Sequence, residues 1–253
     1  MGIILIRYWI KCVVVCMSSS LQVTSPQGTH LIIGSSSGIG NSLAHLSLQG
    51  GEIVYGVSRS SSELNHSDYT HIEGDARNPE EFVDHLPKKI DYLTFCPGQI
   101  FLGSMRRTIP EDLLNSFESN VVDAFRVIQT VRNRITQSIV LISSVAAKVG
   151  IPNHSAISAS KSALEGLART MAAELSPRIR VNVVAPTLSP TETATRLVGG
   201  EDALPRVASL HPLKALPSPD EVASAISYFH VQAKTVTGQS LAVDAGMSLV
   251  QSR

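Results

Sequence analysis

The sequence has no excess of charge of either sign and few aromatic residues. Its 253 residues contain 21 Lys and Arg against 21 Asp and Glu, and only 5% are aromatic. Without a basic excess, nucleic acid is a poor candidate for a partner. Hydrophobic residues make up 43% of the chain. They are mainly Ala, Val, Ile and Leu, which is typical of packed α/β layers. The length suffices for one large domain with a full core.

Cysteine is scarce. Cys12, Cys16 and Cys96 are the three in the chain, and their spacing indicates neither a zinc site nor a disulfide framework. We therefore expect no metal, and the reducing cytoplasm is the simplest compartment.

A long apolar run is also lacking. Residues 2–16 are apolar but contain Arg7 and Lys11, so they are too short and too charged for a good membrane-spanning helix. They also lack the features of a secretory signal. Met17 precedes three serines and resembles a natural start. We expect residues 1–28 to be an extension outside the fold, with a membrane anchor in residues 1–16 as the minor alternative.

From residue 29 onward, apolar runs alternate with helical patterns. Strands are expected at 30–34, 53–58, 70–72, 90–96, 138–143, 179–185 and 240–243, and helices at 41–49, 79–86, 110–132, 156–175 and 219–229. This alternation predicts parallel βαβ units in one α/β domain over residues 29–253, a three-layer, doubly wound Rossmann fold. In such sheets, ligands bind at the carboxyl ends of the strands.

A glycine-rich turn follows the first expected strand. Residues 34–40 read Gly-Ser-Ser-Ser-Gly-Ile-Gly and lead into a helical segment. Glycines let the backbone approach a phosphate, and N–H groups at a helix start favour an anion. The turn is therefore a candidate dinucleotide-binding loop. Its expected cofactor contacts are Gly34, Ser36, Ser37, Gly38, Ile39 and Gly40.

The end of the second expected strand bears on the type of cofactor. An acidic residue there would bond the ribose hydroxyls of NAD and repel a 2′-phosphate. This chain has Arg59 and Ser60 instead, and a guanidinium can pair with a phosphate. The sequence therefore favours NADP over NAD, the alternative being that Arg59 is a solvated loop residue.

These features resemble the short-chain dehydrogenase/reductase family, from about residue 29 to the C-terminus. The glycine loop matches except that Ile33 replaces the usual threonine, and further motifs match at 75–76, 118–121, 142–144, 180–191 and 237–246. The resemblance implies an NAD(P)-dependent oxidoreductase that transfers a hydride between NADP(H) and a small carbonyl or alcohol substrate.

The resemblance also implies residue roles. Ser144 would bond the substrate oxygen, Lys161 would contact the nicotinamide ribose, and Asn120 would hold Lys161 through water. On the cofactor side, the matching positions are Asp75 near the adenine, Gly98 after the fourth strand, and Pro186 and Thr191 near the nicotinamide.

One catalytic position departs from the family. The proton-exchanging tyrosine stands four positions before the lysine, where this chain has Ile157. Ser144 lies thirteen positions before Ile157, so no gap brings in another tyrosine. A Cys-Pro-Gly loop at 96–98 and a His-x-x-Ile-x-x-x-Lys segment beginning at His154 resemble a bacterial subgroup that lacks the tyrosine.

Isoleucine cannot exchange a proton, and three hypotheses follow. The first is an NADP-dependent oxidoreductase with non-standard acid/base residues, in which His154, Lys161 or a water supplies the proton. In that hypothesis, the alternative for His154 is a loop histidine without a role. The second is a catalytically silent NADP-binding protein, a sensor or a partner subunit. The third, a structural role without cofactor, is disfavoured by the intact glycine loop and Arg59.

The resemblance further implies a homodimer or homotetramer through the helices at 110–132 and 156–175. Leu164, Leu167 and Met171 form an apolar stripe that could face a second copy or the chain's own sheet. Residues 188–212 form the expected specificity region. The polar residues Thr193, Thr195 and Arg196 are consistent with a helical lid but identify no substrate.

Overall fold

The fold is built on one parallel β-sheet. The computed structural model describes residues 28–251, so the predictions for residues 1–27, including the membrane-anchor alternative, lie outside the described residues. The strand order is β3-β2-β1-β4-β5-β6-β7, and every neighbouring pair is parallel. The predicted doubly wound α/β sheet is confirmed. The strands are β1 (Thr29–Ile33), β2 (Ile53–Ser58), β3 (Tyr69–Glu73), β4 (Ile90–Phe95), β5 (Ile135–Ile142), β6 (Arg180–Pro186) and β7 (Ser240–Val243).

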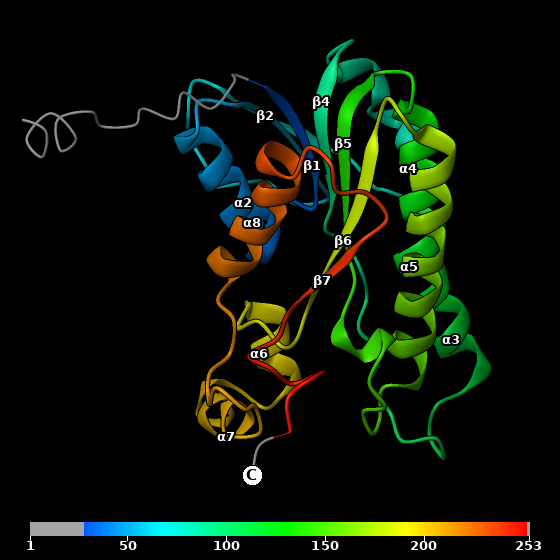
Figure 1. Ribbon diagram of the computed structural model, residues 1–253, viewed down its shortest axis with the longest axis vertical. Coiled ribbons are helices and arrows are strands. Elements are labelled where there is room, and N and C mark those ends of the chain that lie inside the picture. Colours follow the sequence, from blue (N-terminus) through cyan, green and yellow to red (C-terminus); the bar gives the residue numbers. More distant parts are fainter. Residues whose placement is uncertain (1–27, 252–253) are drawn as a thin grey trace, which may run out of the picture.

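Helices cover both faces of this sheet (Figure 1). One face packs against α2 (Gly38–Gln49) and α8 (Pro219–Ser227), the other against α4 (Asp123–Val131) and α5 (Ser155–Leu175). Before α4 lies α3 (Pro110–Phe117), and after α8 lies the helical turn η6 (Tyr228–Gln232). The short helices α6 (Glu192–Leu197) and α7 (Leu204–Ala208) lie at one end of the molecule, after β6.

Apolar side chains of the strands alternate between the two layers. On β1, Leu31 and Ile33 face α4 and α5, whereas Ile32 faces α2 and α8. Because both faces are covered, each central strand reads as a continuous apolar run. This continuity explains why the strand positions could be predicted closely.

The apolar stripe on α5 belongs to this core. Leu164 and Met171 are 0% and 5% exposed, and Leu167 packs against the same cluster. The stripe therefore faces the chain's own sheet, which settles the alternative that the sequence left open.

Two predicted helices were partly wrong. Residues 79–86 form two 3₁₀ turns, η1 (Pro79–Glu81) and η2 (Val83–His85), because a segment this short does not offset the cost of α-helix nucleation. The helix predicted at 110–132 contains a π-helical turn, η3 (Glu118–Val122), between α3 and α4. Such turns are frequent at functional sites, and this one carries Asn120.

The strand order reverses between β1 and β4, where a doubly wound sheet opens a crevice. The glycine-rich turn follows β1, and the Cys-Pro-Gly loop follows β4. Both predicted site segments therefore meet at this crevice. Among the described residues, no helix combines the length and apolarity needed to cross a bilayer.

Candidate functional site

The glycine loop is a cradle that side chains would block. Gly34 and Gly38 have φ angles of +83° and +56°, which disfavour residues with a side chain. A Cβ on Gly40 would overlap the carbonyl oxygen of Gly34, so this glycine lets α2 pack closely on the loop. A Cβ on Gly38 would lie 3.0 Å from Thr191 Cγ2, on the segment that follows β6. The three glycine positions of the loop therefore leave the main chain open to the close approach of a ligand.

The three serines of the loop have different environments. Ser35 is fully buried, and its hydroxyl is 3.1 Å from the hydroxyl of Tyr69. Ser36 Oγ lies 3.1 Å from Ser60 Oγ, which joins the loop to the end of β2. Ser37 occupies the N-cap of α2 without a side-chain capping bond. The first amides of α2 therefore remain available to an anion.

A cavity of about 640 Å³ adjoins this part of the loop. Its lining includes Ser36, Ser37 and Asn41 from the loop and α2, and Ser61 and Glu63 after β2. Its volume lies in the range of ligand sites. Arg59 and Ser60, exposed at the end of β2, stand beside it in sequence.

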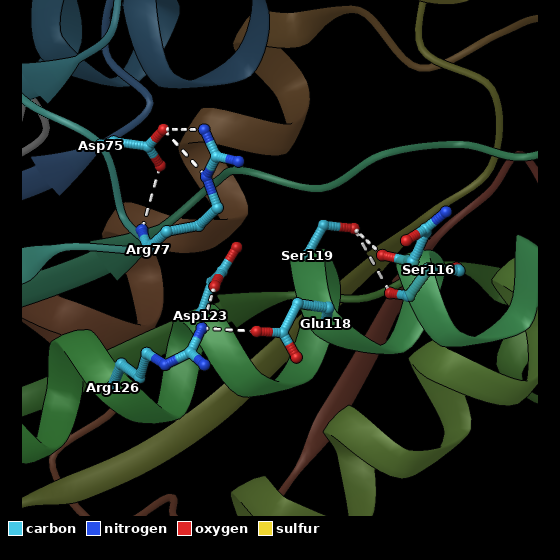
Figure 2. Close-up of polar contacts among 8 residues, drawn as sticks. Asp75, Arg77, Ser116, Glu118, Ser119, Asp123 and Arg126 are labelled. Carbon is cyan, nitrogen blue, oxygen red and sulfur yellow. Dashed lines mark hydrogen bonds and ion pairs between the residues drawn. The ribbon is translucent and has the colours of Figure 1, made fainter. Parts of the chain in front are cut away.

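Asp75, expected near the adenine, forms an ion pair with Arg77, which lies two residues later. Arg77 donates to Asp75 Oδ2 from Nε (3.0 Å) and Nη2 (2.5 Å), and its backbone amide donates to Oδ1. These bonds from Arg77 lower the pKa of Asp75, and Arg59 adds a smaller effect in the same direction. Figure 2 shows this pair facing the helical segment that carries Asp123. The Asp-x-Arg spacing at 75–77 is the sequence feature from which this pairing could have been predicted.

Thr191 and Pro186 frame the other side of the cleft. Pro186 is the buried last residue of β6, and Thr191 is the N-cap of α6, where its hydroxyl accepts a bond from the amide of Ala194. The contact between Thr191 and Gly38 brings this segment against the glycine loop. A Cβ on Gly34 would lie 3.2 Å from Pro97, so the loop after β4 meets the glycine loop as well.

Asn120 presents an unpaired oxygen inside the protein. Its Nδ2 donates to the carbonyl oxygens of Ser116 (2.8 Å) and Gln99 (3.1 Å). Its Oδ1 is buried and has no partner among the described residues. A Cβ on Gly98 would overlap that oxygen and lie 3.1 Å from Lys161 Nζ. Asn120, Gly98 and Lys161 therefore lie close together.

Lys161 is a buried ammonium. Its side chain is on α5, the residue is 6% exposed, and Nζ donates to the carbonyl oxygen of Ile142 at 2.7 Å. Burial lowers the pKa of Lys161 to about 8, while the neighbouring Cys96 has a smaller, opposing effect. Burial likewise raises the pKa of the Cys96 thiol to about 12, against a smaller effect of Lys161. The proximity of Cys96 could not be inferred from the sequence.

The remaining predicted residues lie around the start of α5. Ile157 is buried one turn before Lys161, and Ser144 follows β5, where its hydroxyl accepts a bond from the amide of Ala146. His154 is the N-cap of α5, and its Nδ1 is 2.7 Å from the carbonyl oxygen of Pro152. The hydrogen bonds of the described residues do not link His154 to Ser144 or Lys161.

These observations fit a bound dinucleotide. The glycine cradle offers backbone amides to a diphosphate, with the Ser36 and Ser37 hydroxyls beside them. Lys161 has ammonium protons beyond the one given to Ile142, and Asn120 Oδ1 lacks a donor. The glycine loop, Asn120 and Lys161 thus lie around one crevice.

Comparison with known proteins identifies the family. Residues 33–248 match the family described as enoyl-(acyl carrier protein) reductase. Carbonyl reductase family member 4 of Danio rerio is 30% identical over 237 residues, which are 87% of this chain and 98% of that protein.

Two other relatives align over shorter regions. A chloroplastic tropinone reductase homolog of Arabidopsis thaliana is 39% identical over 114 residues, 44% of this chain and only 35% of that protein. An inactive 2-(S)-hydroxypropyl-CoM dehydrogenase of Xanthobacter autotrophicus is 41% identical over 120 residues, 45% of this chain and 52% of that protein.

Solved structures agree with these relatives. Ligand-free aldohexose dehydrogenase of Thermoplasma acidophilum superposes with a TM-score of 0.83 at 27% identity, over 90% of this chain and 96% of that one. A variant of actinorhodin polyketide ketoreductase with NADPH superposes with a TM-score of 0.80 at 26% identity, over 90% and 99% of the two chains. The chain therefore belongs to the short-chain dehydrogenase/reductase family of NAD(P)-dependent oxidoreductases.

Proposed function

We propose that this protein uses NADPH to reduce the carbonyl group of a small molecule. The observation that carries the proposal is the convergence of Lys161, Asn120 and Gly98 at the same crevice as the glycine cradle. When bound there, the reduced nicotinamide supplies a hydride. The named activities of the relatives, such as carbonyl reduction, are consistent with this reaction class and do not identify a substrate.

The preference for NADPH rests on charge at the end of β2. Arg59 is exposed there, and its charge adds a small effect to the larger one by which Arg77 lowers the pKa of Asp75, which supports placing the guanidinium on the side expected for the adenine. Ser36 and Ser60 meet between this arginine and the glycine loop. A 2′-phosphate would receive hydroxyl and guanidinium donors there. The position that ends β2 carries no carboxylate, and the carboxylate nearest to it in the cavity lining is Glu63.

The chain's own residues have distinct tasks in this proposal. Gly34, Ser36, Ser37, Gly38, Ile39 and Gly40 hold the diphosphate, and Gly98, Pro186 and Thr191 contact the nicotinamide side. Ser144 donates its hydroxyl hydrogen to the substrate oxygen, since its oxygen already accepts from Ala146. Lys161 bonds the nicotinamide ribose.

A silent NADP-binding protein is the second candidate, favoured by one observation. Ile157 is buried at the position of the family's proton-exchanging tyrosine and offers no polar atom. Losing a general acid typically costs a factor of about 10² to 10⁴ in rate. Under this alternative, the cofactor binds as a regulatory signal.

Cofactor binding is tested by titrating the full chain with NADPH and with NADH, followed by fluorescence. We expect tighter binding of NADPH, and a rise of roughly tenfold to a hundredfold in its Kd for Arg59→Glu, from loss of a charged hydrogen bond. The control is Arg178→Glu, an exposed arginine before the amino end of β6. No binding of either nucleotide at millimolar concentration would refute both candidates.

Catalysis is tested by screening carbonyl compounds for NADPH oxidation with the parent protein and with Ile157→Tyr. Activity in the parent supports the reductase. Activity that emerges only when the tyrosine is introduced supports the silent protein, because the cofactor and the other site residues are then sufficient.

We further propose a homodimer or homotetramer. The outer side of α3 and α4 exposes Leu113, Leu114, Phe117 and Phe125, with Leu114 67% exposed. Several large exposed apolar side chains on one helical segment favour an interface there. Light scattering after size-exclusion chromatography should give a multiple of 27.1 kDa, and Leu114→Asp should lower it.

A further inference from the structure

We infer that Lys161 itself donates the proton to the substrate oxygen, in the place of the missing tyrosine. The inference rests on the proposed reductase function and adds a catalytic residue to it. The evidence is the position of Lys161 Nζ, the groups that surround it and the lack of another well-placed proton donor in the site.

Nζ lies directly beneath the surface of the cleft. A Cβ on Gly98 would be 3.1 Å from Nζ, and Gly98 itself is exposed. Only a residue without a side chain therefore separates the ammonium from solvent on this side. A side chain at 98 would crowd Nζ and overlap Asn120 Oδ1, so the glycine leaves room beside the ammonium for a small carbonyl compound.

The ammonium is not committed to a counter-ion. Nζ donates to the carbonyl oxygen of Ile142, which leaves further N–H groups to donate. Among the described residues, Nζ has no salt bridge to a carboxylate. Glu165, one turn later on α5, is bound by Lys148 and Ser240 instead.

The groups that face Nζ favour release of a proton. Cys96 after β4 is the titratable group that acts on it, and Asn120 from η3 is neutral. The raised pKa of Cys96 keeps its thiol uncharged at neutral pH, so no thiolate holds the ammonium. Burial brings the pKa of Lys161 down to about 8, which suits a general acid near neutrality.

Other donors are less well placed. Ile157 has no polar hydrogen. His154 lies at the start of α5, where its Nδ1 meets the carbonyl oxygen of Pro152. The hydroxyl of Ser144 bonds the substrate oxygen but does not give up its proton. Lys161 is thus the acid that lies within the converging group.

With the reduced nicotinamide bound, its hydride would go to the carbonyl carbon, and the π electron pair of the C=O bond would move to oxygen. That oxygen takes one proton from Nζ, so that the alcohol forms and the lysine becomes a neutral amine. A solvent proton, entering past Gly98 and Asn120, restores the ammonium.

Two measurements test the proposal. First, ¹³C NMR of protein labelled at lysine Cε, assigned with Lys161→Arg, follows the titration of Lys161 without cofactor. We expect a midpoint near pH 8. Second, kcat for carbonyl reduction should fall tenfold per pH unit above that midpoint. Lys161→Arg keeps a positive charge but does not release a proton near neutral pH. It should therefore lack this alkaline limb of the pH profile and lose about 10²-fold or more of kcat, while it still binds NADPH.

The matched control is Lys88→Arg, at an exposed position before β4, which should keep the pH limb and the rate. A midpoint above pH 10, a Lys161→Arg protein that keeps the limb, or loss of the limb in His154→Gln would overturn the lysine as donor while leaving the reductase intact. A parent protein that binds NADPH but reduces no carbonyl would overturn the reductase, and the donor with it.

Discussion

Replacing Lys161 with methionine should stabilise the protein in a pH-dependent way. The folded protein buries the ammonium, and this burial lowers its pKa from 10.5 to about 8. In the unfolded chain, the lysine keeps its ordinary pKa. Between pH 8 and 10.5, the unfolded state therefore binds more protons, and the parent protein gains stability as pH rises. Methionine has a similar shape and no charge, so it does not respond to pH.

The magnitude follows from the pKa difference. A shift from 10.5 to about 8 corresponds to an electrostatic cost of about 3 kcal/mol at pH 7, since each pKa unit is worth roughly 1.4 kcal/mol. The same relation leaves a cost of about 1 kcal/mol at pH 9.5. The lost bond from Nζ to Ile142 subtracts about 1 kcal/mol from the gain at either pH. The net stabilisation should thus be about 2 kcal/mol at pH 7 and close to zero at pH 9.5.

Urea unfolding followed by circular dichroism, under reducing conditions, gives both free energies at each pH. The control Lys88→Met removes an exposed lysine, for which no pH-dependent difference from the parent is expected. A gap between Lys161→Met and the parent that stays constant from pH 7 to 9.5 would refute the reasoning, because Lys161 would then titrate alike in both states.

Two further predictions concern other parts of the fold. Gly38→Ala should weaken NADPH binding at least about tenfold, because it adds a Cβ 3.0 Å from Thr191 and strains a φ of +56°. Gly51→Ala is its control: it carries similar strain at φ +80° but meets nothing within 4 Å, so it should lose stability and keep NADPH affinity. His230, 1% exposed, has a pKa held well below its usual range by burial and by the nearby His30, Arg180 and Lys234. The unfolded state alone takes up that proton, so stability should fall below about pH 6.5 by up to roughly 1.4 kcal/mol per pH unit. Urea titrations at pH 5.5 and 7.5 should show a smaller fall for His230→Gln, and an equal fall would exclude His230 as the cause.

Local signals in the sequence were sufficient for the sheet and for the cofactor loop. Gly34, Gly38 and Gly40 are spaced for a cradle, and the structure places them where a Cβ would clash or be strained. Covered strands read as apolar runs, so their order along the chain followed directly. The boundary of the domain at residue 29 and the cytoplasmic location stay predictions.

Contacts between distant segments could not be predicted. The turn carrying Asn120 is π-helical, and its amide bridges Ser116 and Gln99. The 3₁₀ turns at 79–85 replaced an expected helix, and Phe82 between them is fully buried. Likewise, the sequence alone did not show that the apolar stripe around Leu164 packs against the chain's own sheet.

The sequence by itself determined that the chain forms a doubly wound sheet with a glycine cradle, an arginine at the end of β2 and an isoleucine before Lys161. These are properties of single positions and of local periodicity. Only the tertiary structure decided that Lys161 is buried beside Cys96, that Gly98 leaves Nζ near the surface and that Asn120 Oδ1 is unpaired. The physical reason is that a pKa depends on desolvation and on neighbouring charges, and both arise only when β4, β5, η3 and α5 pack together.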